Sequence, residues 1–275
     1  MIIDNKYNSS VIFSKLYFIW PRTIPNSFIT KFKSSLFSIL KFQNYFYCML
    51  TQDAIKQKLG VYAADYVQQD MLIGLGTGST VYYLLKELGK RKEQGLNFTA
   101  VCTSLQTQKI LDEEGIKYFS LNEVDRLQLA IDGADEVDVN GNLIKGGGGA
   151  LLQEKIVEAS CKELIIIVDE KKDVQTLGAF PLPVEVITFG WKQVQQKIEK
   201  TYNIKIQLRE KDNKIFITDH KHYILDCYFN SITNPAQLNT DLHLIPGVVE
   251  TGLFINMATK IITGYSDGTI KERDI

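Results

Sequence analysis

Residues 71–80 read MLIGLGTGST, and this stretch decides the fold. The apolar residues 71–73 predict a short buried strand, the glycines after them predict a tight turn, and Ser79 or Thr80 begins a helix. A strand that turns directly into a helix presents a row of backbone N–H groups at the positive end of that helix. The stretch therefore predicts a β-α unit whose turn binds an anion, and the alternative is a tight turn that binds no ligand.

Two better-known glycine motifs do not fit this turn. A Walker A loop is excluded because no Gly-Lys-Ser/Thr follows at the required place. The dinucleotide fingerprint is broken, because Ser79 takes the position of its third glycine and Gly78 comes one residue early.

Outward from this unit, strands alternate with helices. Helices are predicted at about 51–66, from residue 79, at 105–114 and at about 150–161, and strands at 71–73, 98–102, 116–119, 127–131 and 164–168. This alternation predicts right-handed crossovers and an α/β fold with a doubly wound, mostly parallel sheet. Ligands of such sheets bind outside the carboxyl ends of the strands.

The order changes after Pro181 and Pro183. Strands are predicted at 184–189, 204–208, either 214–218 or 223–227, 248–254 and 260–265, with helices at 191–202 and 235–242. This order predicts a small α+β unit built on a split β-α-β motif. We therefore assign residues 180–248 to a smaller domain, and residues 49–179 with 249–275 to the larger one.

Two further motifs directly follow predicted strands or lie near them. Residues 132–136 read DGADE, and residues 145–150 read KGGGGA with Glu154 on the next helix. Crowded carboxylates disturb one another's pKa values, which favours a catalytic site. An exposed acidic loop and a divalent-metal site are the alternative interpretations, and Lys145, as a counter-charge, makes the metal site the weaker of them.

Four consecutive glycines are costly to order, so they indicate close approach to a ligand or a moving loop. Alone, Glu154 would be an ordinary surface charge, but the three motifs together predict an enzyme that binds a small phosphorylated molecule and moves a proton on it.

Composition narrows the function classes. The 275 residues carry a net charge of −1, with 45% apolar and 23% charged residues, which is typical of a globular protein and not of a general nucleic-acid binder. The four cysteines form no C-x-x-C pair, which fits a reducing compartment and no structural zinc. His220 and His222 have a spacing that a strand could use for a metal, but plain solvated histidines are the more common reading.

Residues 1–48 differ from the rest of the chain. They hold six basic residues and one acidic residue, a net +5, and are rich in Phe, Tyr, Ile and Ser. Lys15 interrupts the best apolar run, at 11–20, so neither a signal peptide nor a membrane span is predicted. A disordered extension or mis-assigned start, an organelle presequence and a functional segment all stay open. A cytoplasmic location is expected, with organelle targeting as the alternative.

Several motifs in order resemble one family, the A-type ribose-5-phosphate isomerases. They are GLGTGST at 74–80, DGADE at 132–136, KGGGGA at 145–150, QEKI at 153–156, FPLPVEV at 180–186 and IPGVV at 245–249. The resemblance runs from Met49 to the C-terminus. It implies a Rossmann-like domain with a smaller ferredoxin-like domain, no metal and no cofactor, a sugar-phosphate substrate, and a homodimer or sometimes a tetramer.

The resemblance also implies site residues. Glu154 matches the general base, and Asp132, Asp135 and Lys145 match residues near the sugar's C1, C2 and ring oxygen. The residues implied in substrate binding are Lys56, Thr77, Gly78, Ser79, Thr80, Gly133, Ala134, Gly146, Gly147, Gly148 and Lys172.

The implied reaction interconverts D-ribose 5-phosphate and D-ribulose 5-phosphate. Asp132 or Asp135 would give a proton to the ring oxygen, and Glu154 would move a proton from C2 to C1 through a cis-enediolate that Lys145 stabilises. Burial should raise the pKa of Glu154 toward neutrality. The rivals are a sugar-phosphate sensor without a base, an NAD-dependent oxidoreductase, which the broken fingerprint opposes, and a CoA transferase.

Overall fold

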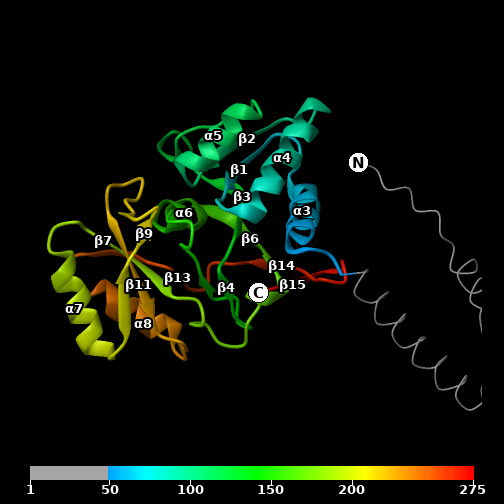
Figure 1. The fold of residues 1–275 in the computed structure, drawn as a ribbon. Helices are drawn as coiled ribbons and strands as arrows, with labels where there is room; N and C mark the ends of the chain where they lie inside the picture. The colour runs from blue at the N-terminus through cyan, green and yellow to red at the C-terminus, as the bar shows by residue number, and fades with distance from the viewer. Residues whose placement is uncertain (1–48) are drawn as a thin grey trace, which may run out of the picture. The chain divides into compact units, whose positions relative to one another are not determined.

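Six strands form the central sheet, in the order β15-β14-β6-β3-β1-β2 (Figure 1). Every neighbouring pair is parallel except β14–β15, which is antiparallel at the edge. The strands are β1 (Met71–Leu75), β2 (Phe98–Cys102), β3 (Leu127–Gly133), β6 (Cys161–Asp169), β14 (Lys260–Gly264) and β15 (Ile270–Asp274). The predicted α/β class with a mostly parallel sheet is confirmed in this computed structural model, which describes residues 49–275. The predictions for residues 1–48 lie outside the described residues.

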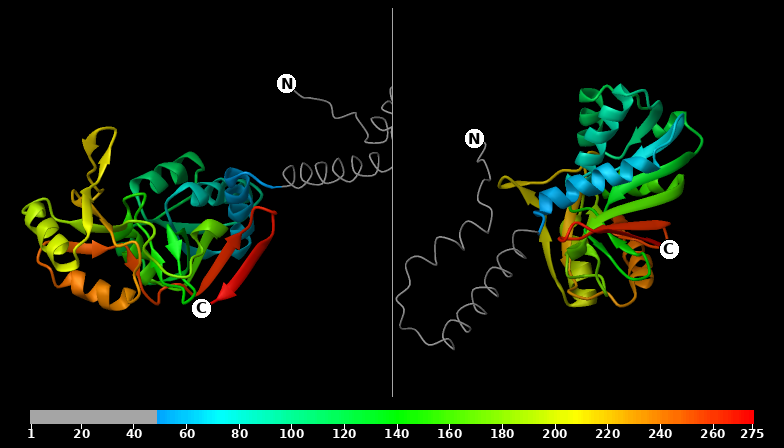
Figure 2. Two further views of the ribbon diagram at one scale, coloured as in Figure 1. Left: turned by 60° about the horizontal axis from the view of Figure 1, so that its bottom comes forward. Right: turned by 90° about the vertical axis from the view of Figure 1, so that its right-hand side faces the viewer.

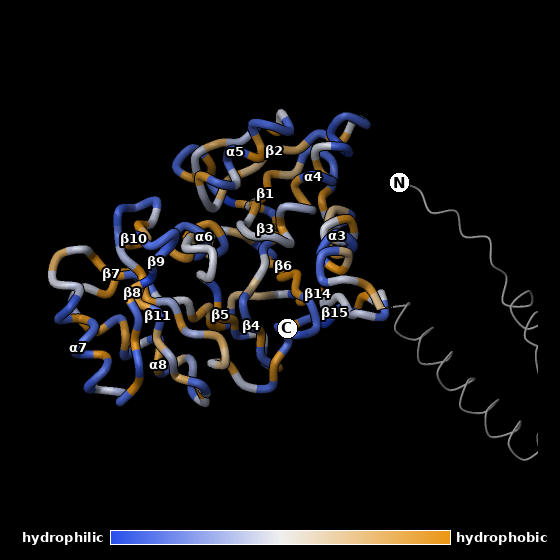
Figure 3. Tube along the Cα trace, viewed as in Figure 1, coloured by the Kyte–Doolittle hydropathy of each residue, from blue (hydrophilic) through white to orange (hydrophobic). Residues whose placement is uncertain are grey.

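Helices cover both faces of this sheet, as Figures 1 and 2 show. Ile165 and Ile167 of β6 pack in one hydrophobic cluster with side chains of α3 (Gln52–Ala63), α4 (Ser79–Glu93) and α5 (Leu105–Glu113). The alternate residues Leu164 and Ile166 pack in a second cluster with Leu151 of α6 (Leu151–Ala159). Successive side chains of a strand point to opposite faces, so a strand covered on both sides is apolar throughout. Figure 3 shows this hydrophobic character along the central strands.

A second sheet contains β12-β7-β11-β8, all antiparallel. Its strands are β7 (Leu182–Val186), β8 (Lys205–Leu208), β11 (Tyr223–Tyr228) and β12 (Val248–Thr251), with α7 (Trp191–Tyr202) after β7 and α8 (Pro235–His243) after β11. In chain order this is β-α-β-β-α-β with spatial order 4-1-3-2, the ferredoxin-like arrangement. The predicted ferredoxin-like unit is therefore confirmed, whereas the two-domain division and its boundaries stay a prediction.

The predicted strand at 116–119 is wrong. This stretch makes only an isolated parallel bridge between Tyr118 and Ala100, with hydrogen bonds from Ala100 N to Lys117 O and from Phe119 N to Ala100 O. The segment lies beyond β2, the edge strand of the sheet, and no further strand among residues 49–275 covers it.

The predicted strand at 248–254 is divided at Gly252. The Gly252 N–H donates to Pro183 O, and its carbonyl accepts from Lys145 N, so the chain passes from one sheet to another at this residue. Beyond it, β13 (Leu253–Phe254) joins β5 (Leu143–Ile144) and β4 (Glu136–Val137) in a small antiparallel sheet that was not predicted.

Of the two alternatives for the strand after residue 208, the structure takes Tyr223–Tyr228 as β11. Residues near the other alternative form a short hairpin of β9 (Glu210–Lys211) and β10 (Lys214–Ile215). Three 3₁₀ turns complete the described elements: η1 (Ala64–Tyr66), η2 (Leu121–Glu123) and η3 (Glu170–Lys172).

Within residues 49–275, no helix has the length and apolar character needed to cross a membrane. The cytoplasmic location and the homodimer stay predictions.

Candidate active site

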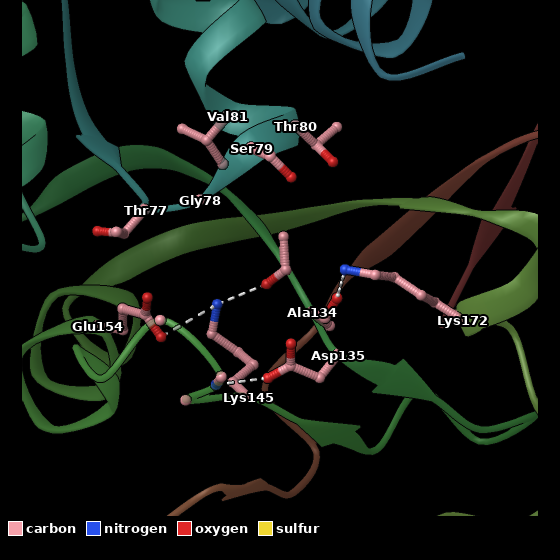
Figure 4. A pocket seen from close by; sticks show the side chains of 14 residues that line it. Thr77, Gly78, Ser79, Thr80, Val81, Ala134, Asp135, Lys145, Glu154 and Lys172 are labelled. Carbon is pink, nitrogen blue, oxygen red and sulfur yellow. Dashed lines mark hydrogen bonds and ion pairs between the residues drawn. The ribbon is translucent and has the colours of Figure 1, made fainter. Parts of the chain in front are cut away.

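A cavity of about 230 Å³ opens at the carboxyl ends of β1 and β3 (Figure 4). It brings together the turn before α4, the acidic motif at the end of β3, the glycine-rich loop and Lys172 of η3. Every predicted site residue lines this cavity except Asp132 and Lys56, and Val81 lines it in addition. Stretches distant in the sequence therefore meet at one edge of the sheet, as the strand order requires.

The N-terminus of α4 forms one wall of the cavity. Gly78 caps the helix with φ of 122°, a conformation that side chains disfavour, and the first helical residues Ser79, Thr80 and Val81 face the cavity. The first N–H groups of a helix have no partner within it, and they carry the positive end of the helix dipole. This wall is therefore suited to a phosphate.

Hydroxyl groups hold the turn before α4 from beneath. Thr77 Oγ1 lies 2.8 Å from Thr103 Oγ1, donates to Ser104 Oγ at 2.8 Å, and lies 3.1 Å from Thr107 Oγ1. Thr107 Oγ1 in turn donates to Gly76 O at 2.7 Å. The Thr77 side chain thus fixes the loop, and these three partners, in the turn between β2 and α5 and on α5, were not predicted.

The three carboxylates of residues 132–136 separate into different surroundings. Asp132, 1% exposed, accepts from Thr77 N and Gly133 N, and its carboxylate fills the space where a Cβ on Gly76 would lie 1.9 Å away. Asp135 lines the cavity and accepts from Gly147 N at 2.7 Å. Glu136 turns away, accepting from Gly178 N and Phe180 N. The carboxylates of Asp132 and Glu136 therefore hold the backbone from inside the protein, and Asp135 is the one that faces the cavity.

A buried ammonium group lies beside the cavity among three carboxylates. Lys145, 2% exposed, donates from Nζ to Gly133 O at 2.6 Å, and its Nζ lies 2.8 Å from Asp132, 3.2 Å from Glu158 and 3.5 Å from Glu154. The three carboxylates are close enough together to share a metal ion, but the ammonium group already supplies a positive charge at their centre. Lys145 and Glu154 point toward each other in Figure 4.

Burial disturbs the ionisation of this cluster. The pKa of Glu154 is raised to about 8, mainly by burial, although the charge of Lys145 acts to lower it. Burial acts to lower the pKa of Lys145, but its three carboxylate neighbours raise it well above the usual value, so this residue stays charged. Glu154 is thus a buried carboxyl poised near neutral pH next to a permanent cation, as general acid–base chemistry requires.

The comparisons with known proteins agree with this geometry. The family model of ribose 5-phosphate isomerase A (phosphoriboisomerase A) matches residues 99–268. The chain belongs to this family. It is therefore an isomerase, and the resemblance read from the sequence motifs is confirmed.

Curated and solved relatives support the assignment along most of the chain. A ribose-5-phosphate isomerase A of Bacillus mycoides is 53% identical over 79% of this chain and 98% of its own length, and one of Ruegeria is 47% identical over 78% and 84%. A solved D-ribose-5-phosphate isomerase in complex with phospho-erythronic acid is 38% identical, covers 82% of this chain and 100% of its own, and has a TM-score of 0.79. Ribose 5-phosphate isomerase from Plasmodium falciparum gives 36% identity and the same TM-score, with 82% and 99% covered.

The two predicted lysines of the isomerase lie at different distances from its cavity. Lys172 lines it and donates to Ala134 O at 2.6 Å. Lys56 is half-buried on α3 and lies one turn after Gln52, which donates to Asp169 at the start of η3. Residues i and i+4 share a helix face, so Lys56 faces the η3 side of the site without lining the cavity.

Arg209 holds the glycine-rich loop from the ferredoxin-like unit. Its Nη1 donates to Gly146 O at 2.5 Å and Gly147 O at 3.3 Å, while its other nitrogens bind the carboxylate of Asp226. These contacts fix the peptides that present Gly147 N to Asp135. No sequence spacing links Arg209 to the loop, so it was not predicted.

We expect Arg209→Ala to raise KM about 10-fold or more, because two charge-assisted hydrogen bonds on the loop are lost. Arg209→Lys is the matched control, since it keeps the charge but lacks the planar fork, and it should recover part of the loss. Steady-state kinetics with ribose 5-phosphate measure KM in both variants. Unchanged KM in Arg209→Ala would show that the loop keeps its shape unaided.

Proposed function

We propose that this protein interconverts D-ribose 5-phosphate and D-ribulose 5-phosphate through a cis-enediolate, with Glu154 as the base. The observation that carries the proposal is the single cavity that has a helix N-terminus on one wall and the Glu154–Lys145 pair on another. The names of the relatives support the substrate.

Phosphate binding would orient the sugar. The N–H groups at the start of α4 receive the phosphate, and Lys172 adds a positive charge at the same cavity. The phosphate is remote from the reacting carbons, so its binding energy serves to hold C1 and C2 against the base.

Proton transfer then follows from the positions of the carboxylates. Asp135 lines the cavity and Asp132 does not, so we assign ring opening to Asp135. Glu154 removes the proton from C2, the hydroxyl proton moves from O2 to O1, and Glu154 returns its proton to C1. The ammonium of Lys145 stabilises the negative charge that develops on the enediolate oxygen.

The complex of one relative with phospho-erythronic acid suggests an inhibitor. This compound has a phosphate at one end and a planar carboxylate at the other. The carboxylate has two oxygens and a negative charge that Lys145 could bind as it would bind an enediolate. We therefore expect phospho-erythronic acid to compete with ribose 5-phosphate.

The direct test is formation of ribulose 5-phosphate from ribose 5-phosphate, in the presence of EDTA and without added cofactor. The proposal requires full activity, because Lys145 supplies the positive charge and no cofactor takes part. A protein that binds the sugar phosphate but produces no ketose would be a sensor, and this would overturn the proposal.

The pH dependence follows from the raised pKa of Glu154. A base acts only when ionised, so kcat/KM should rise with pH and level off above about 8. Below this pH the slope should approach tenfold per unit, since one proton blocks the base. The substrate phosphate titrates near pH 6, about two units below the pKa of Glu154, so the two effects on kcat/KM can be told apart. A plateau reached already at pH 6 would contradict the assignment.

A further inference from the structure

Glu158 is a buried carboxyl that the proposed reaction does not use. It is 3% exposed, lies one turn after Glu154 on α6, and does not line the cavity. Neither of its carboxyl oxygens accepts a hydrogen bond from any described residue. Its one charged neighbour is Lys145, whose Nζ lies 3.2 Å away and is shared with two other carboxylates. A buried carboxyl that accepts no hydrogen bond is costly, so its presence beside the reacting groups needs an explanation.

The charges around Glu158 do not balance if every group is ionised. Asp132, Glu154 and Glu158 all lie within 3.5 Å of one ammonium, that of Lys145. Three carboxylates and one cation leave a net charge of −2 on side chains that are all at most 4% exposed. A buried group relieves such a charge by taking up a proton.

The other groups that face Glu158 do not supply the missing charge. Lys155 lies on the same helix, but it binds Glu250 at 2.6 Å and the carbonyls of Thr251 and Leu253. Its pKa is lowered, mainly by burial. Cys161 of β6 is only partly exposed, and burial raises its pKa to about 11, so it stays neutral. The proton must therefore reside on the carboxylates themselves.

Glu158 is the member of the cluster best placed to keep this proton. Asp132 accepts two backbone hydrogen bonds in addition to the ion pair with Lys145, and both stabilise its ionised form. Glu154 borders the cavity, whereas Glu158 has no backbone donor. Oxygens of Asp132, Glu154 and Glu158 lie within 4.8 Å of one another. The pKa of Glu158 is raised well above its usual value, by burial first and then by the charge of Asp132, although Lys145 acts to lower it.

We propose that Glu158 is a positioning residue that stays protonated and donates a hydrogen bond to Asp132. Asp132 then stays ionised and holds Lys145 in place beside Glu154. A charged Glu158 would place a second negative charge near Glu154 and raise the pKa of Glu154 further; the neutral Glu158 does not. This inference rests on the proposed role of Glu154.

Two substitutions separate a neutral donor from a charged carboxylate. Glu158→Gln keeps the shape and an N–H donor, so kcat and KM should stay within about threefold of the original protein. The pH at which kcat/KM reaches half of its plateau should shift by less than about half a unit. Glu158→Leu keeps the volume but removes the donor, so kcat should fall about tenfold with KM within twofold, because a hydrogen bond to a charged group is lost.

Each other outcome overturns the inference. If the pH at which kcat/KM reaches half of its plateau is lower in Glu158→Gln by about half a unit or more, Glu158 was a charged neighbour of Glu154. If kcat of Glu158→Gln falls tenfold, the amide cannot replace the acid. If Glu158→Leu keeps full kcat, the residue positions nothing.

Infrared spectroscopy gives a readout that does not depend on activity. Glu154 is itself protonated near neutral pH, so the measurement starts from Glu154→Gln, which removes that carboxyl. The carbonyl stretch of a protonated carboxylic acid should be present at pH 7 in Glu154→Gln and lost when Glu158→Gln is added, and a band that is absent from the first protein or that persists in the second would overturn the inference even if Glu158→Leu fails to fold. Proton exchange at C2 is also measured in Glu154→Gln. If that variant keeps proton exchange at C2, the assignment of Glu154 as the base is wrong. The infrared result reports the protonation of Glu158 independently of that assignment.

Discussion

Glu154→Gln should abolish proton exchange at C2 while the protein still binds ribose 5-phosphate. Glutamine has nearly the same shape as the protonated form of Glu154, which the raised pKa makes abundant at neutral pH, so the cavity should keep its geometry. The amide cannot accept the C2 proton, and we expect a loss of about 10²- to 10⁴-fold in kcat, the usual contribution of a positioned base. Deuterium incorporation from D₂O into ribose 5-phosphate, followed by NMR, measures this step directly.

The matched control is Glu158→Gln, which makes the same change one helical turn away in an equally buried position. It should keep exchange because Glu158 does not line the cavity and the amide keeps a neutral hydrogen-bond donor at this position. Substrate affinity is measured by calorimetry in both variants and should stay within a few-fold of the original. Exchange in Glu154→Gln within about tenfold of normal would transfer the role of base to another group, with Asp135 as the next carboxylate in the cavity.

Local sequence patterns were sufficient to predict most of the helices and strands. The helix predicted at 191–202 is α7, and the strand at 98–102 is β2, because each has a clear period and clear end signals. The errors fall where pairing between distant segments decides the structure. Residues 116–119 have the composition of a strand but make only one bridge. The short strands β4 and β5 exist only because they pair with each other and with β13, and no local signal predicts them. β13 lies within the strand predicted at 248–254, but its change to another sheet was not predicted.

The site was predictable where the strand order determines it. The carboxyl ends of β1 and β3 must lie at the same edge of a parallel sheet, so the glycine turn and the acidic motif had to meet. Which carboxylate faces the cavity depended on side-chain direction, and Asp132 turned inward. The spacing of Glu154 and Glu158 was a usable signal, since residues four apart share a helix face, but Arg209 reaches the loop through tertiary packing alone.

Lys145→Met should remove activity and also destabilise the protein, with the stability loss growing as pH rises. The substitution keeps most of the apolar stem but leaves Asp132, Glu154 and Glu158 without their cation. Loss of the group that stabilises the enediolate should lower kcat about 10²-fold or more. Breaking a buried ion pair on one side costs about 3–5 kcal/mol of unfolding free energy, or roughly 6–20 °C in Tm for a domain of this size.

The direction of the pH effect follows from the carboxyl pKa values. Glu154 has a folded-state pKa of about 8 against an ordinary value of 4.5, so the folded state binds its proton more tightly than the unfolded state. Its contribution to stability is therefore complete below pH 4.5 and is lost as pH rises toward 8. Without the charge of Lys145, which lowers the pKa of Glu154 and of Glu158, both values rise and this loss becomes larger. Thermal unfolding from pH 5 to pH 9 should thus show a widening gap between the variant and the original protein.

Lys155→Met separates the electrostatic effect from simple loss of a buried lysine. Lys155 packs against the ring of Phe254, as Lys145 does, with ammonium-to-centroid distances of 4.6 and 5.4 Å. It neutralises Glu250, whose pKa is lowered to about 2 and which His243 also contacts, so Glu250 keeps a partner when Lys155 is removed. Lys155→Met should therefore lose stability while its kcat changes only a few-fold. An equal loss of kcat in the two variants would mean that the position of α6, and not the ammonium beside Glu154, limits the reaction.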